Sequence, residues 1–213
     1  MIMNNQRLIV SVIGRKGGAG KTTTTLNVAG AFGEAGHRVT LIDLDPQSSL
    51  ARLVEDVLGP GTTVQDLGPQ AEAHATRGDI VPWLRAQLPA TGVVVIDTPP
   101  HLGLILDAAV AVADRVLLPT RLAQQDIDSL LDTLDRCPSG ALIVANAVSR
   151  YRVHQDALSA LRDAYDGQVW TREIPESVVI LEACNAGLPV VRYKKRSAPA
   201  AAYRALAAAV LAP

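Results

Sequence analysis

The chain has 213 residues, which is enough for one α/β domain with a substantial core. Hydrophobic residues make up 48% and charged residues 19%, so the composition indicates a globular protein and excludes an intrinsically disordered one. The formal net charge of −1 neither favours nor excludes a polyanionic partner, because such binding depends on where the charges lie.

Apolar strand-like runs alternate with helical patterns along the chain, which is typical of a parallel sheet covered by helices on both faces. Strands are expected at 8–13, 38–42, 93–96, 115–118, 141–145 and 169–174. Helices are expected at 22–35, 81–88, 102–113, 122–136, 153–165 and 200–211. Residues 59–70, which contain several Gly and Pro, are expected to form a surface connection. The fold class that follows is α/β with a mostly parallel, twisted sheet.

The sequence also predicts one domain spanning 1–213, because it has no internal repeat and no long linker. No apolar stretch approaches the ~20 residues that a membrane-spanning helix needs, and the N-terminus lacks the pattern of a signal peptide. Cys137 and Cys184 lie far apart without CxxC spacing, which disfavours a disulfide scaffold or a zinc site. A cytoplasmic location is therefore expected.

The most informative segment is Lys16–Thr22, which follows the first apolar run. A glycine-rich loop between a strand and a helix can turn its backbone N–H groups around phosphate oxygens. In such a loop Lys21 contacts the β- and γ-phosphates, and the Thr22 hydroxyl ligates Mg²⁺. The usual first glycine is replaced by Arg15, and a second lysine, Lys16, follows it. The alternative, a tight turn without a nucleotide, is disfavoured by the strand–helix context.

Three acidic residues, Asp43, Asp45 and Asp97, follow expected strands, where ligands of open parallel sheets bind. Asp97 is expected to hold Mg²⁺, often through water, and the alternative is an N-cap of the next helix. Asp43 and Asp45 would share one face if the strand continued through both. We assign Asp43 to the metal side and Asp45 to the orientation of the attacking water, and the two roles could be exchanged.

Together, the runs 16–23, 41–47 and 95–100 resemble the motifs of the ParA family, the partition ATPases with a deviant Walker A loop. The segments 174–190 and 196–207 resemble the late motif and the closing helix of that family, so the resemblance covers nearly the whole chain. It implies a P-loop NTPase fold, ATP and Mg²⁺ as cofactors, and an ATP-dependent homodimer. Because the first strand is expected from residue 8, we predict the small type that lacks an N-terminal helix-turn-helix domain.

The resemblance also implies a role for each matching residue. Catalytic roles fall on Lys16, which would reach the partner's phosphates, on Lys21 and on Asp45. The implied ATP-binding residues are Lys16, Gly17, Gly18, Ala19, Gly20, Lys21, Thr22, Thr23, Asn146 and Pro175. The implied metal-side residues are Thr22, Asp43 and Asp97. Asn146 would read the adenine and Pro175 would pack against the base; the alternative for Asn146 is an ordinary turn residue.

Members of the family bind DNA non-specifically as dimers and are released when a DNA-bound ParB-like adaptor stimulates hydrolysis. This chain has no acidic residue from Val190 onward, and such a basic segment would bind phosphates in a salt-dependent way. The expected DNA-binding residues are Arg192, Lys194, Lys195, Arg196 and Arg204. The alternative is a solvated basic face without a partner. Relatives often carry arginines near the Pro175 motif, where this chain has Glu176 and Val179, so DNA binding is weaker or displaced toward the C-terminal cluster.

The function expected from these features is ATP-dependent partition of plasmid or chromosomal DNA by a nucleoid-associated protein. Three other functions are weighed against it. A membrane-bound, MinD-like ATPase is disfavoured because residues 200–213 are mostly alanine and form no stable membrane anchor. An iron–sulfur reductase is disfavoured because no cysteine lies near 97–100. Positioning of a protein cargo by the same ATPase cannot be separated from DNA partition by sequence.

Overall fold

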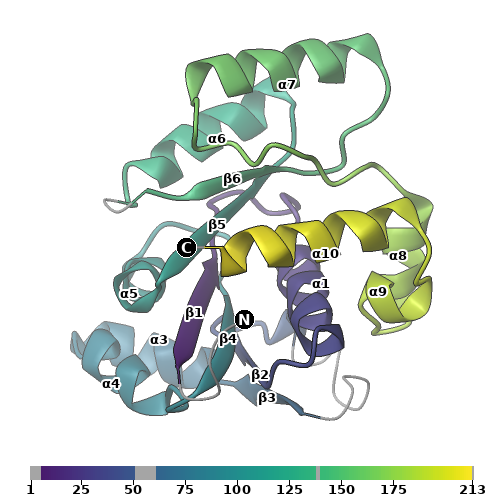
Figure 1. Cartoon of the computed structure of the whole chain (residues 1–213). Coiled ribbons are helices and arrows are strands. Elements are labelled where there is room, and N and C mark those ends of the chain that lie inside the picture. The colour runs from purple at the N-terminus through teal and green to yellow at the C-terminus, as the bar shows by residue number, and fades with distance from the viewer. Residues whose placement is uncertain (1–5, 51–60, 138–139, 213) are drawn as a thin grey trace.

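The computed structural model, drawn in Figure 1, describes residues 6–50, 61–137 and 140–212. In this part of the chain the centre is a sheet of six parallel strands in the order β3-β2-β4-β1-β5-β6. The strands are β1 Arg7–Val12, β2 Val39–Asp43, β3 Thr62–Asp66, β4 Gly92–Asp97, β5 Arg115–Thr120 and β6 Leu142–Ala145. The register pairs Asp97 with both Val12 and Asp43, so the carboxyl ends of three neighbouring strands lie level. The expected parallel α/β sheet is confirmed.

Helices cover both faces of this sheet, as expected (Figure 1). Those in the described residues are α1 Lys21–Glu34, α3 Gly68–Arg77, α4 Ile80–Gln87, α5 Leu104–Val112, α6 Gln124–Leu134, α7 Arg152–Ala164, α8 Val178–Asn185, α9 Val190–Tyr193 and α10 Ala198–Leu211. Residues of α1 and α8–α10 form one buried cluster with the sheet, and residues of α3–α7 form two others. None of the helices in the described ranges is long and apolar enough to span a bilayer.

Side chains of β1 alternate between the two faces, as a strand requires. Val10 and Val12 join the cluster beneath α1 and α10, whereas Ile9 joins the cluster beneath α3–α5. Both faces are covered, so the strand sequences are almost continuously apolar, and Val93–Ile96 of β4 is buried throughout.

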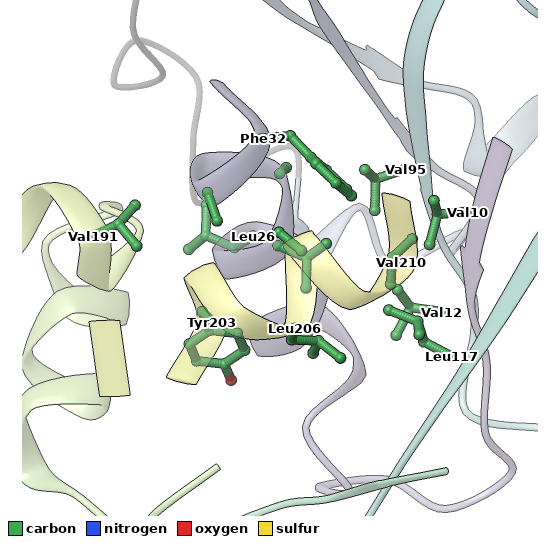
Figure 2. Packing of buried hydrophobic residues seen from close by; sticks show 14 of the residues in the cluster. Val10, Val12, Leu26, Phe32, Val95, Leu117, Val191, Tyr203, Leu206 and Val210 are labelled. Atoms are coloured by element: carbon green, nitrogen blue, oxygen red, sulfur yellow. The ribbon is translucent and has the colours of Figure 1, made fainter. Parts of the chain in front are cut away.

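The core beneath α1 holds the helix that follows the glycine-rich loop. Figure 2 shows side chains of α1, α10 and the strands converging there, among them Leu26, Phe32, Leu206 and Val210. Each fully buried side chain of this size contributes about 1.5–3 kcal/mol relative to an exposed one. The helix that follows the glycine-rich loop is therefore anchored to the sheet by buried side chains from Leu26 onward.

The segment 59–70 does not match the expected surface connection. Its described part, from residue 61, contains β3 and the start of α3. β3 pairs with β2 from Thr62 to Asp66 and is the outermost strand on that side. Its residues are half-buried or exposed, so the polar sequence TTVQD lacks the apolar run that identified the inner strands. Gly59 and Pro60 lie outside the described residues.

The strand expected at 169–174 does not form. The region instead makes isolated parallel bridges, Ile143 to Val169 and Val148 to Pro175. Ile174 donates its N–H to Ala145 O at 2.9 Å and accepts the N–H of Val148 at 3.0 Å. The segment thus follows β6 loosely and holds the loop after that strand in place. The helices α8 and α9 beyond it were not predicted.

Candidate functional site

The loop between β1 and α1 depends on glycines with a left-handed backbone. The φ angles of Gly18 and Gly20 are +78° and +97°, which residues with a side chain rarely adopt. A Cβ on Gly20 would also lie 2.0 Å from Nδ2 of Asn146. Gly17 and Gly18 face open space, so a ligand can approach the backbone there. Helix α1 begins directly after the loop, which makes this concave surface an anion site.

Asn146 connects this loop to the end of β6. Its Nδ2 donates to Ala19 O at 3.0 Å, and its Oδ1 accepts the N–H of Ala147 at 2.9 Å. Its own N–H donates to Thr120 O at the end of β5 at 2.7 Å. The structure therefore brings Asn146 to the predicted site and adds a role that the sequence did not predict, the support of the glycine-rich loop.

Lys21 is the buried cation of the site. Its Nζ donates to Lys16 O at 3.1 Å inside the loop. Burial lowers the pKa of Lys21, while the nearby Asp97 and Asp45 oppose that shift. An anion bound in the loop would add to that opposing effect and favour the charged form.

Asp97 lies opposite the first turn of α1 and is fully buried. Its carboxylate accepts hydrogen bonds from Thr22 Oγ1 at 2.7 Å and from Thr25 Oγ1 at 3.1 Å. Burial raises the pKa of Asp97 to about 7, against the hydrogen bond from Thr22, and the charge of Asp43 adds to the rise. A buried carboxylate and a hydroxyl this close fit a hard cation such as Mg²⁺, which prefers oxygen ligands.

The strand β2 ends at Asp43, so Asp43 and Asp45 do not share one face of a continuing strand. The Asp43 carboxylate accepts the N–H groups of Asp45 at 3.0 Å and Leu50 at 2.9 Å and is fully buried. Asp45 is half-buried and accepts the N–H of Gln47 at 3.0 Å. Asp43 therefore shapes the loop after β2, and Asp45 lines the cleft described next.

A cleft of about 850 Å³ lies between the glycine-rich loop and α8. It brings together many of the residues singled out in the sequence: Gly17, Gly18, Gly20, Lys21, Thr22, Thr23, Asp45, Asn146 and Pro175. It also includes Arg121, His154 and Cys184, which sequence reasoning missed or left without a role. Arg121 and His154 lie outside every motif and Cys184 lies within 174–190, but no sequence signal distinguished these three from surface residues.

Lys16 forms an ion pair within its own subunit. Its Nζ lies 2.7 Å from Oδ1 of Asp126 in α6, and the carboxyl side chain is only 6% exposed. Sequence reasoning assigned Lys16 to the phosphates of the partner subunit and did not identify Asp126 as its partner in an ion pair. Asp126 belongs to an amphipathic helix with several acidic residues, and its sequence position does not distinguish it from the solvated ones.

The basic residues near the C-terminus divide into two kinds. Lys194, Lys195 and Arg196 are exposed in the turn between α9 and α10. Arg204 pairs with Glu34 at the end of α1, with Nε 2.5 Å and Nη2 2.9 Å from its carboxylate oxygens. It also donates to Lys195 O at 2.7 Å. Arg204 thus ties this turn to α1, and its charge is balanced by Glu34.

Comparison with known proteins gives an independent assignment. Residues 10–190 match the family model described as the CobQ/CobB/MinD/ParA nucleotide binding domain. The chain is 34% identical over 202 residues to maintenance of carboxysome distribution protein A from Gloeobacter kilaueensis, with 89% of this chain and 87% of that protein covered. It is 26% identical over 242 residues to chromosome partitioning protein ParA from Myxococcus xanthus, with 93% and 86% covered.

The solved structures include cobyrinic acid a,c-diamide synthase from Mycobacterium smegmatis with a bound ATP analogue and magnesium. It matches this fold with a TM-score of 0.72 and 25% identity, covering 97% of this chain and 94% of that one. The family model spans most of the chain, and the glycine-rich loop, Lys21 and Asp97 lie together as a nucleotide site requires. The chain therefore belongs to the CobQ/CobB/MinD/ParA family of nucleotide-binding domains.

Proposed function

We propose that this protein is an Mg²⁺-dependent ATPase that dimerises with ATP, binds DNA non-specifically and partitions plasmid or chromosomal DNA with a ParB-like adaptor. The observation that carries the proposal is the cleft between the glycine-rich loop and α8, into which a polyphosphate can be placed against unhindered backbone at Gly17 and Gly18. Family membership and similarity to a chromosome partitioning protein support it. The protein is then cytoplasmic and associated with the nucleoid.

Residues in the cleft and buried beside it have distinct parts in this proposal. The backbone N–H groups of the loop and Lys21 bind the phosphates, and the bound anion favours the charged form of Lys21. Thr22 and Asp97 would hold Mg²⁺, which neutralises phosphate charge when bound. Asp43 supports the metal side of the site, because its carboxylate shapes the loop after β2. Asp45, at the edge of the cleft, accepts a hydrogen bond from the attacking water and orients it.

The nucleoside end of the cleft is formed by Asn146 and Pro175, which come from segments joined by backbone hydrogen bonds. Val148 donates to Ile174 O and accepts from Glu176 N–H, each at 3.0 Å. This pairing holds the two segments at a set distance, as recognition of a flat base requires. We assign reading of the adenine to Asn146 and packing against the base to Pro175.

Dimerisation is tested by two substitutions. Lys16→Ala should leave ATP binding in place and abolish the ATP-dependent dimer, because Lys16 is assigned to the partner's phosphates. Asp45→Ala should keep the ATP-bound dimer and lose hydrolysis, so that DNA binding persists. Size-exclusion chromatography with light scattering, run with ATP, ADP or no nucleotide, measures whether each variant forms the dimer. A Lys16→Ala protein that still dimerises with ATP refutes the cross-subunit role.

DNA binding is assigned to the exposed turn with Lys194, Lys195 and Arg196, and Arg192 lies on the adjoining helix α9. Arg204 supports this turn through Lys195 O. Changing the three turn residues to alanine should weaken DNA binding in ATP and leave basal ATPase activity unchanged.

The matched control is the exposed pair Arg150 and Arg172, changed to alanine together. Binding to a random-sequence duplex is measured across a salt series with ATP, ADP and no nucleotide. Each lost phosphate contact should reduce the log–log salt slope by about 0.9. Equal slopes for the triple variant and the control would place DNA binding elsewhere.

A second candidate function is the positioning of a protein cargo by the same ATPase switch. It is favoured by the relative at 34% identity, which is a carboxysome distribution protein. Imaging this protein with a fluorescent tag, in cells with and without the product of the neighbouring gene, distinguishes DNA partition from positioning of a protein cargo. Redistribution of a protein assembly, with plasmid and chromosome inheritance unchanged, supports the second function. A MinD-like membrane function is tested by flotation with liposomes and ATP, and strong co-flotation would favour it over DNA partition.

A further inference from the structure

Arg121 is a cation in the wall of the cleft that no motif accounts for. It follows directly after β5, lines the cleft beside Leu122 and Ala123, and is exposed. Its guanidinium makes no hydrogen bond or ion pair with any of the residues that the structure describes. An unpaired arginine in a cleft that takes a polyanion is a candidate ligand contact.

The backbone beneath Arg121 is held on both sides. Before it, Thr120 O accepts the N–H of Asn146 at 2.7 Å, and after it Leu122 is buried in the core of that side. β5 is paired with β1, and Ile13, which precedes the glycine-rich loop, donates its N–H to Leu117 O at 3.0 Å. The backbone of Arg121 is therefore fixed beside the glycine-rich loop.

Besides Lys21, Arg121 is the cation among the described residues that line this cleft. Lys21 is directed into the loop, where it donates to Lys16 O, and Lys16 itself is paired with Asp126. The other charged residues of the wall, Asp45, Asp126 and Glu176, are acidic. A nucleoside triphosphate adds several more negative charges, of which one divalent ion offsets only two. The distal phosphate lies beyond the backbone cradle for the α- and β-phosphates, so a second cation besides Lys21 would help to neutralise it.

We propose that Arg121 binds the γ-phosphate of ATP in its own subunit and stabilises the charge that develops there during hydrolysis. The planar guanidinium can donate two parallel N–H bonds to phosphate oxygens. Water oxygen forms the new bond to phosphorus, ADP leaves with the electron pair of the broken bond, and the proton of the water ends on inorganic phosphate. Arg121 stays protonated throughout and acts by charge and position. This inference depends on the ATPase function proposed above.

The test separates ATP from ADP. Affinities for both are measured by isothermal titration calorimetry in a Lys16→Ala background, in which no partner subunit is expected to contribute. Arg121→Ala should weaken ATP binding about tenfold or more and change ADP binding less than twofold. Arg121→Lys keeps the charge without the planar fork and should recover part of the loss. Arg150→Ala, an exposed arginine outside the cleft wall, should leave both affinities unchanged.

In the otherwise wild-type protein, Arg121→Ala should also lower the ATPase rate at saturating ATP at least tenfold. Equal losses for ATP and ADP would overturn the assignment to the γ-phosphate, and unchanged affinities and rate would overturn any contact. A rate loss in the dimer without an affinity loss in the Lys16→Ala background would overturn the same-subunit assignment. Failure of the unmodified protein to bind ATP, with Lys21→Ala no different, would instead refute the proposed function, and this inference with it.

Discussion

The ion pair between Lys16 and Asp126 predicts that dimerisation costs free energy, because the pair within each subunit must break. The two charged atoms are 2.7 Å apart, and the Asp126 side chain is almost fully buried. When Lys16 reaches the phosphates of a partner subunit, this carboxylate loses its cation. The substitution Asp126→Asn removes the negative charge at nearly constant volume, so it should make Lys16 available without opening a cavity in α6.

The size of the effect follows from the geometry. Two unit charges at this separation attract by about 6 kcal/mol at an effective dielectric of ~20, before desolvation and screening are subtracted. Because the Lys16 side chain is 35% exposed, we take about 1–2 kcal/mol as the net value of one pair. Each dimer breaks two pairs, so Asp126→Asn should lower the dimer dissociation constant by roughly 30- to 700-fold, at about 1.4 kcal/mol per factor of ten.

Sedimentation equilibrium with a non-hydrolysable ATP analogue at fixed salt measures this constant. The matched control is Asp132→Asn on the same helix, whose carboxylate pairs with Arg15 and is 49% exposed, and its dimer should be unchanged. A dimer of Asp126→Asn that is weaker than wild type would refute the reasoning, because Asp126 would then position Lys16 for the partner. An unchanged dimer would show that the pair costs nothing to break.

Three other outcomes follow from the site. ATP should protect Cys184 from alkylation, because Cys184 lines the cleft. Cys137 should react slowly with or without ATP, because burial raises its pKa to about 11. Mass spectrometry that finds equal protection of both cysteines by ATP would contradict this prediction. The hydrogen bond from Arg204 lowers the pKa of Glu34, so its stabilisation is present above the ordinary glutamate pKa of about 4.3 and is lost as pH falls through the folded value. Arg204→Met should therefore reduce the free energy of unfolding by up to ~1 kcal/mol at pH 7. The free energy of unfolding of this variant should also fall less steeply on acidification than that of the wild type. Urea unfolding curves identical to wild type at every pH would show that the Arg204–Glu34 pair does not stabilise the protein. Asn146→Ala should weaken ATP and ADP alike by roughly tenfold, because it releases the glycine-rich loop, and a calorimetric loss confined to ATP would argue against that support role.

The parts of the fold that sequence reasoning predicted are those encoded by local pattern. The parallel sheet follows from apolar runs such as Val93–Ile96, because strands buried on both faces tolerate few polar residues. The glycine-rich loop is likewise contiguous in sequence, and the positive φ angles at Gly18 and Gly20 favour glycine there. The outer strand β3 was missed because an edge strand is only partly buried and its sequence carries no such constraint.

What the sequence determined by itself was therefore the parallel α/β class of the sheet and the place of the glycine-rich loop after its first strand, since both depend on residue type along a continuous segment. Only the tertiary structure decided which charges meet: Lys16 with Asp126, and Arg204 with Glu34. One polar residue of an amphipathic helix resembles the next in sequence, and only the packing of distant helices and loops selects the one that is buried against a partner. The electrostatics of the site are for that reason a property of the folded chain, although the loop that binds the phosphates can be identified from its residues alone.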